Sequence, residues 1–134
     1  MRLLFCLLLL IAQPVASAAD QVLYCVDELA TGFAKKNGEY KKVSFELSKR
    51  TLKVTGDIIK EKVEGFTVSY YCEDSFFTRI NSETMFCESL SAKPSIYYLN
   101  KDTLKYIHII HGRFDLLKDG DDAYGTILGR CEKF

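Results

Sequence analysis

The stretch Phe-Thr-Val-Ser-Tyr-Tyr-Cys-Glu, residues 66–73, decides the fold class of this chain. Its even-numbered positions hold Phe66, Val68, Tyr70 and Cys72, whereas the odd-numbered positions are mostly polar. Successive side chains of a strand point to opposite faces, so this alternation predicts a β-strand with one buried face. The adjacent rings of the Tyr-Tyr pair are then expected to lie on opposite faces.

The same pattern recurs on both sides of that strand. In residues 42–48, Lys-Val-Ser-Phe-Glu-Leu-Ser, the apolar side chains fall at every second position. The dipeptide Asn37-Gly38 before it is a strong hairpin signal because both residues tolerate positive φ. Turn residues follow roughly every ten positions, as at 48–50, 55–57, 81–83, 100–102 and 118–121.

This spacing predicts an all-β protein, a small antiparallel barrel or sandwich in which a meander of strands is favoured. Short helical turns at 57–62, or at 27–36 in place of the first hairpin arm, are the alternatives to an all-strand assignment. The strands are expected at 22–26, 32–35, 41–48, 51–55, 66–73, 77–81, 84–89, 95–99, 104–111 and 123–130.

The N-terminus has the pattern of a cleavable signal peptide. Arg2 precedes an apolar run over residues 3–12, and the small residues Ala16-Ser17-Ala18 offer a cleavage site. The run is shorter than the roughly 20 apolar residues that a membrane-spanning helix needs, so we expect no stable membrane anchor. Residues 1–18 are therefore predicted to be removed, which leaves one domain, 19–134, in a secreted or periplasmic location.

The charge balance argues against a nucleic-acid partner. Lys and Arg number 18, as do Asp and Glu, and removal of Arg2 leaves 17 against 18. No strong field therefore recruits an anionic polymer or membrane.

The cysteines predict a disulfide framework. Cys6 leaves with the signal peptide, and the remaining four are an even number in a small exported domain. None of them forms the closely spaced pair that is typical of a zinc site. Four cysteines allow three pairings. Closure of a barrel would bring the first and last strands together, which favours Cys25 with Cys131 and Cys72 with Cys87.

No catalytic, cofactor or metal site is predicted. His108 and His111 are three residues apart and would face opposite sides of a strand. Residues 119–122, Asp-Gly-Asp-Asp, superficially resemble a calcium loop, but Leu117 occupies a ligand position, and a solvated hairpin turn is favoured. No serine lies in a Gly-x-Ser-x-Gly elbow. A non-catalytic role is therefore expected.

Aromatic residues are the one compositional excess, with nine Phe, eight Tyr and no Trp. They would line an interior pocket for a small apolar ligand, or form an exposed contact surface for a protein partner. The simpler explanation is that such side chains suit strands. An apolar-ligand binding protein is the first functional hypothesis, and the alternative is a protein–protein interaction module such as an inhibitor of a secreted hydrolase.

Parts of the chain resemble a class of small uncharacterised exported bacterial β-rich proteins, which has no assigned activity. Size, hairpin order and cysteine use are also similar to those of small lipocalin-like barrels and periplasmic lysozyme-inhibitor barrels, although the Gly-x-Trp motif is missing. The first resemblance is carried by Cys25, Gly32-Phe33, Asn37-Gly38-Glu39-Tyr40, Phe45, Gly125 and Gly129-Arg130-Cys131.

Overall fold

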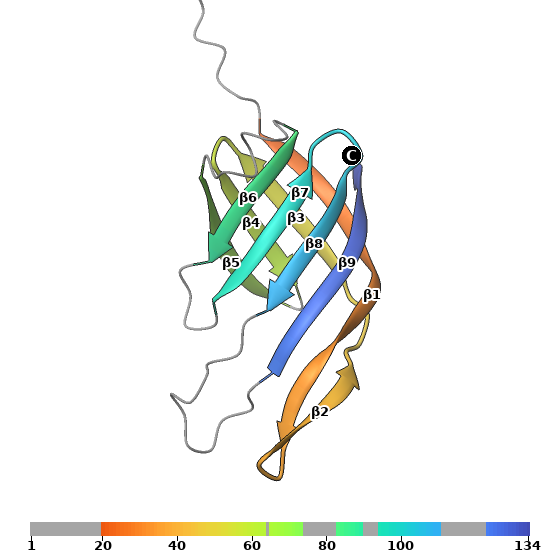
Figure 1. The fold of residues 1–134 in the computed structure, drawn as a ribbon. Coiled ribbons are helices and arrows are strands. Elements are labelled where there is room, and N and C mark those ends of the chain that lie inside the picture. Colours follow the sequence, from red (N-terminus) through yellow and green to blue (C-terminus); the bar gives the residue numbers. More distant parts are fainter. Residues whose placement is uncertain (1–19, 64, 74–82, 90–93, 111–122) are drawn as a thin grey trace, which may run out of the picture.

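The computed structural model describes residues 20–63, 65–73, 83–89, 94–110 and 123–134 (Figure 1). All regular elements in these ranges are strands, in agreement with the predicted all-β class. They are β1 (Gln21–Lys36), β2 (Glu39–Ser44), β3 (Lys49–Thr55), β4 (Ile58–Val63), β5 (Phe66–Glu73), β6 (Thr84–Ser89), β7 (Ser95–Asn100), β8 (Lys105–Ile110) and β9 (Ala123–Lys133).

The strands form a closed antiparallel barrel rather than a sandwich. The order is β1-β3-β4-β5-β6-β7-β8-β9, and β9 pairs back onto β1. Apart from the inserted β2, each strand pairs with the next one in the chain, so the predicted meander is confirmed. Closure leaves none of these eight strands as an open sheet edge.

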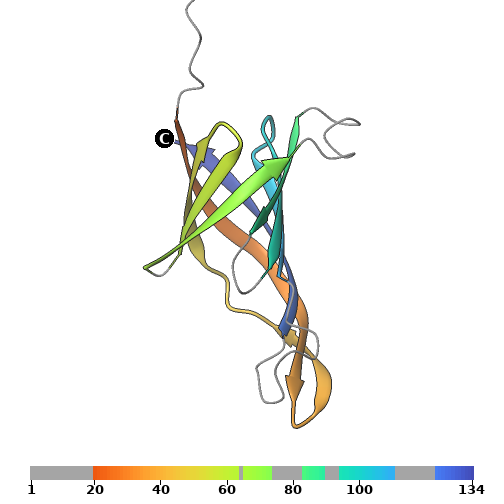
Figure 2. The same ribbon diagram turned by 90° about the vertical axis from the view of Figure 1, so that its left-hand side faces the viewer.

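Strand β1 is long enough to take part both in the barrel and in a hairpin with β2. Its first part pairs with β3, its second part pairs with β2, and both parts pair with β9. The β1–β2 hairpin projects beyond the barrel at the end away from the C-terminus (Figures 1 and 2). Its turn is the predicted one, with φ of 55° at Asn37 and 84° at Gly38.

Several predicted boundaries are wrong. Residues 57–62 and 27–36 are not helical turns, because they belong to the β3–β4 hairpin and to β1, and the ranges 22–26 and 32–35 lie in that single strand. The strand expected at 41–48 ends at Ser44, and the turn expected at 48–50 overlaps the start of β3. Predictions at 77–81, His111 and 119–122 fall outside the described residues.

The strand β4 was missed because its inward-facing position 61 is a glutamate. Lys60 and Lys62 flank this residue, so the apolar alternation that reveals a half-buried strand is interrupted at its centre.

Two disulfides join neighbouring strands. Cys25 in β1 is bonded to Cys131 in β9, and Cys72 in β5 is bonded to Cys87 in β6. These are the pairs that the closure argument favoured. The first bond lies across the line at which the barrel closes, and both indicate an oxidising, non-cytoplasmic compartment.

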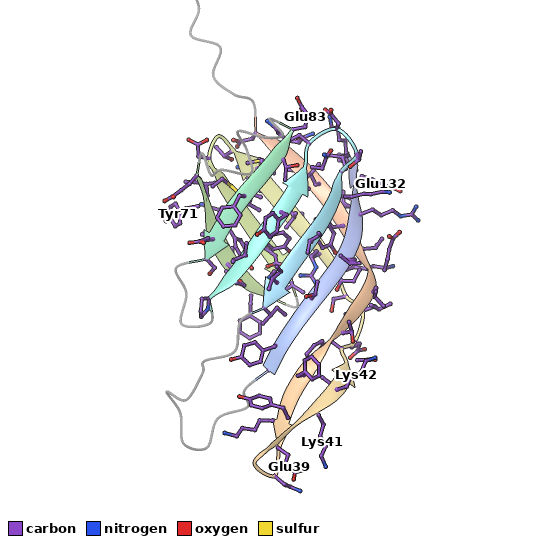
Figure 3. The ribbon with its side chains drawn as sticks, in the orientation of Figure 1. Glu39, Lys41, Lys42, Tyr71, Glu83 and Glu132 are labelled. Atoms are coloured by element: carbon purple, nitrogen blue, oxygen red, sulfur yellow. A yellow bond between two sulfur atoms is a disulfide. The ribbon has the colours of Figure 1, made fainter. Side chains whose placement is uncertain are left out.

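The interior is packed with alternate side chains of every barrel strand. Tyr70 and Tyr97 are fully buried, whereas Tyr71 projects away from the barrel (Figure 3), as the predicted two-faced Tyr-Tyr pair requires. Near the hairpin end, Gly125 faces the ring of Phe45, which would lie 2.6 Å from an added Cβ. The apolar core comprises Leu23, Ala30, Leu52, Ile59, Leu99, Tyr106 and Ile127 with the disulfide-bonded cysteines.

Candidate functional site

A polar cluster lies inside the barrel, built around Arg50 of β3. Its guanidinium nitrogens Nη2 and Nη1 each lie 2.5 Å from a carboxylate oxygen, of Asp27 in β1 and Glu61 in β4 respectively. All three side chains are almost fully buried. Charged groups at such depth are tolerated only when they are paired and hydrogen-bonded.

Tyrosine side chains from three further strands complete the cluster. The hydroxyls of Tyr70 and Tyr97 each donate to Glu61 at 2.7 Å, and the hydroxyl of Tyr106 donates to Asp27. Burial and then the nearby Glu61 carboxylate raise the pKa of Tyr70 and of Tyr97, so both hydroxyls remain donors. Side chains from six strands therefore meet across the middle of the barrel.

His108 of β8 is held in this cluster as a neutral imidazole. Its ring stacks on that of Tyr97 at 4.2 Å between centroids, and its Nδ1 lies 3.3 Å from Nη1 of Arg50. Arginine has only donors, so Nδ1 must accept. Nε2–H then faces the hydroxyl of Tyr70, 3.5 Å away. Burial, with the Arg50 charge beside it, lowers the pKa of His108 to about 4 despite the opposing effect of Glu61.

This buried histidine predicts an acid-dependent loss of stability. Between pH 6.5, the ordinary pKa of histidine, and pH 4 the unfolded chain binds a proton that the folded chain does not, so the free energy of unfolding falls with acidification. A pKa lowered from 6.5 to about 4 corresponds to about 3 kcal/mol of unfolding free energy. Urea denaturation at pH 7 and at pH 4 measures how much unfolding free energy each protein loses on acidification. We expect this loss to be about 3 kcal/mol smaller in His108→Gln than in the wild type. Equal losses would contradict the assignment.

The outer face of the barrel carries a second candidate site along the paired strands β1 and β9. Three hollows follow this pair, with volumes of about 560, 470 and 440 Å³. Each is lined by residues of both strands: 24–26 with 130 and 132, 31–33 with 124–126, and 28 with 128–129. We call this outer surface of β1, β9 and the adjacent β8 the seam face.

The centre of the seam face is a row of apolar side chains in direct cross-strand register. Leu29 of β1 is opposite Leu128 of β9, which is opposite Ile107 of β8. Their exposed fractions are 52%, 37% and 40%. The half-buried rings of Tyr98 in β7 and Phe86 in β6, whose centroids are 5.2 Å apart, continue the row across the next two strands. We call these five residues the apolar row.

Polar groups border the apolar row towards the chain ends. The hollow there is lined by Glu28, Asn100 and Lys105 beside Leu128, and Glu28 forms an ion pair of 3.1 Å with Arg130. An apolar centre with a polar rim is the usual anatomy of a protein-binding surface.

The structure brings together residues that the sequence did not single out. Of the predicted candidates, His108 is buried in the interior cluster, while the cysteines form the disulfides. Arg50, Glu61 and Asp27 were missed because a charged residue within a strand is ordinarily solvent-exposed. The inward alternation of Tyr106, His108 and Ile110 was the available signal for the interior position of the histidine.

Comparison with known protein families, curated proteins and solved structures found no match to this chain. The described residues hold no group of three or more His, Cys, Asp or Glu side chains arranged to bind a metal ion. Within the same ranges, no helix has the length and hydropathy needed to cross a bilayer. Fold and site thus define the class of the protein: a disulfide-bonded, eight-stranded up-and-down barrel whose apolar core encloses a polar cluster and whose outer seam carries an apolar row.

Proposed function

We propose that this chain is an exported, non-catalytic interaction module that binds another protein through the seam face. The single observation that carries the proposal is the apolar row, in which three aliphatic side chains lie exposed on adjacent strands. Contiguous exposed apolar side chains within a polar border are characteristic of contact surfaces. A rigid barrel wall presents them in fixed positions, which limits the entropy lost on binding.

A small apolar ligand inside the barrel is the weaker candidate. Arg50 reaches across the middle of the interior to within 3.2 Å of the hydroxyl of Tyr97. An apolar molecule at that depth would have to displace hydrogen-bonded charges without replacing their partners, which is costly. The buried cluster is better explained as a structural network than as a ligand pocket or a catalytic centre.

A secreted or periplasmic location is part of the proposal. The signal-peptide pattern of residues 1–18 and the two disulfides support it together. A secreted hydrolase, bound and inhibited through the seam face, is a specific partner class consistent with that location.

Site-specific photo-crosslinking tests the proposal. A photo-reactive residue placed at Leu128 in the apolar row should crosslink to a partner in the secreted fraction of the producing cells, because this side chain would be covered in the complex. The same residue at Tyr71, which is 48% exposed in β5 and points away from the barrel, is the matched control. Mass spectrometry of the adducts identifies the partner, and Ile107→Glu should abolish the crosslink from position 128.

Two results would count against the proposal. Crosslinks that form equally from positions 128 and 71 would mean nonspecific contact. In native mass spectrometry of the purified protein we expect the mass of the chain with two disulfides, and a reproducible co-purifying small molecule would favour the interior-ligand hypothesis instead.

A further inference from the structure

The largest of the three hollows differs from the others in its charge. It lies where β1, β3, β4 and β9 meet, and it encloses about 560 Å³. Tyr24 and Val26 of β1 form its apolar floor, and both are partly exposed. Four cationic residues line the hollow, Lys49, Lys62, Arg130 and Arg50, against the single carboxylate of Glu132. Because the Arg50 side chain is buried and paired inside the barrel, the other three are the cations around the outer floor. We call it the cationic hollow.

The placement of these cations follows from strand register. Lys49 and Arg130 are the two cross-strand neighbours of Val26, one on each side of β1. Thr51 is the neighbour of Tyr24 on β3, and Lys62 is in turn opposite Thr51. The positive charges are therefore held around the apolar floor by the sheet itself.

Two of these charges have no ion-pair partner in the part of the chain that the structure describes. Arg130 pairs with Glu28, but neither Lys49 nor Lys62 has an ion-pair partner among the described residues. In the next outward pair on the same strands Lys53 lies directly opposite Lys60, and Lys53 is paired with Asp20 at 2.6 Å. Among the described residues, Lys49 and Lys62 are thus the cations of this hollow that are left for an external carboxylate.

We propose that the cationic hollow binds an acidic segment of a protein partner, in which carboxylate side chains flank an apolar or aromatic one. This inference rests on the proposed interaction function, and it specifies a second contact of the same partner, beside its contact with the apolar row. Carboxylates would meet Lys49 and Lys62, while the apolar side chain would lie against Val26 and the ring of Tyr24. The hollow has the volume of a typical binding pocket.

Two observations favour a peptide over other anions. The formal net charge of the whole chain is 0, so the protein lacks the general positive field that nucleic acid or an anionic membrane requires. The hollow also adjoins the apolar row through β9, where Arg130 lies two residues from Leu128. A single protein partner can therefore occupy both surfaces.

Fluorescence anisotropy on the disulfide-bonded mature protein tests this inference. The probe is the fluorescein-labelled peptide Gly-Asp-Glu-Phe-Asp-Glu-Gly, and its uncharged counterpart is Gly-Asn-Gln-Phe-Asn-Gln-Gly. We expect saturable binding of the acidic peptide, at least about tenfold weaker binding of the uncharged one, and a similar loss in the double variant Lys49→Glu/Lys62→Glu. Lys60→Glu, a charge reversal on β4 outside the hollow, is the matched control and should change the affinity by less than about twofold.

Each alternative outcome rejects the inference in a recognisable way. Binding that is unaffected by the double variant would place the peptide elsewhere. Tight binding to phosphatidylglycerol vesicles, with no binding of the acidic peptide, would identify a lipid surface as the ligand. A crosslink from Leu128 that survives in the Lys49→Glu/Lys62→Glu protein, combined with no peptide binding, would reject the acidic segment while leaving the proposed function intact.

Discussion

Replacement of Arg50 by alanine is expected to lower the free energy of unfolding by about 3–5 kcal/mol. The guanidinium is the cation that both Asp27 and Glu61 contact at 2.5 Å inside the barrel. Its removal leaves two buried carboxylates without that partner, and their desolvation is then uncompensated. Urea denaturation at pH 7, followed by tyrosine fluorescence and circular dichroism, measures the change.

An exposed ion pair provides the matched control for the buried one. Arg130→Ala removes an arginine–carboxylate contact whose side chains are more than half exposed, and it should change stability by less than about 1 kcal/mol. If Arg50→Ala does not fold, the triple variant Arg50→Met/Asp27→Asn/Glu61→Gln tests the role of the buried charges instead. This variant should fold, because it removes the carboxylate charges together with their partner. Equal effects of the two arginine substitutions would contradict the role given to the cluster.

Removal of the disulfide at the barrel seam is the second large effect that we expect. The Cys25→Ala/Cys131→Ala protein should lose about 4–5 kcal/mol, because this bond closes a loop of 106 residues in the unfolded chain. The Cys72→Ala/Cys87→Ala protein should lose about 3 kcal/mol, since the loop there spans 15 residues. Denaturant unfolding of both double variants under identical non-reducing conditions gives the comparison.

The two disulfides are well matched for this purpose. Each joins residues that are directly opposite on neighbouring antiparallel strands, so local geometry differs little and loop length is the main variable. A larger loss from the Cys72–Cys87 pair would show that chain entropy does not govern their contributions. Because the Cys25–Cys131 bond ties together the strands that carry the seam face, its removal should also weaken the crosslink from Leu128.

Much of the scaffold could be predicted from local sequence. Period-two alternation at 66–73 and the Asn37-Gly38 turn each depend on neighbouring residues alone, and the predicted strand and turn are both observed. Phe66, which the alternation placed on the buried face, is 73% exposed at the start of the strand. The paired tyrosines at 70 and 71 are divided between interior and surface for the same reason. Adjacent side chains of a strand must diverge, whatever the rest of the fold does.

The candidate sites depended on contacts between distant residues. Arg50 is 23 residues from Asp27 and 11 from Glu61, and a charged side chain is buried only where such partners meet it. Leu29, Ile107 and Leu128 likewise become one surface only when closure places β1 beside β9.

The sequence by itself thus determined the strand-forming pattern, the even set of four cysteines in the predicted mature chain and the meander of hairpins. Only the tertiary structure decided which charges lie inside the barrel and which apolar side chains gather on its seam. Burial and cross-strand neighbours are set by the closure of the whole sheet, whereas strand propensity is set residue by residue.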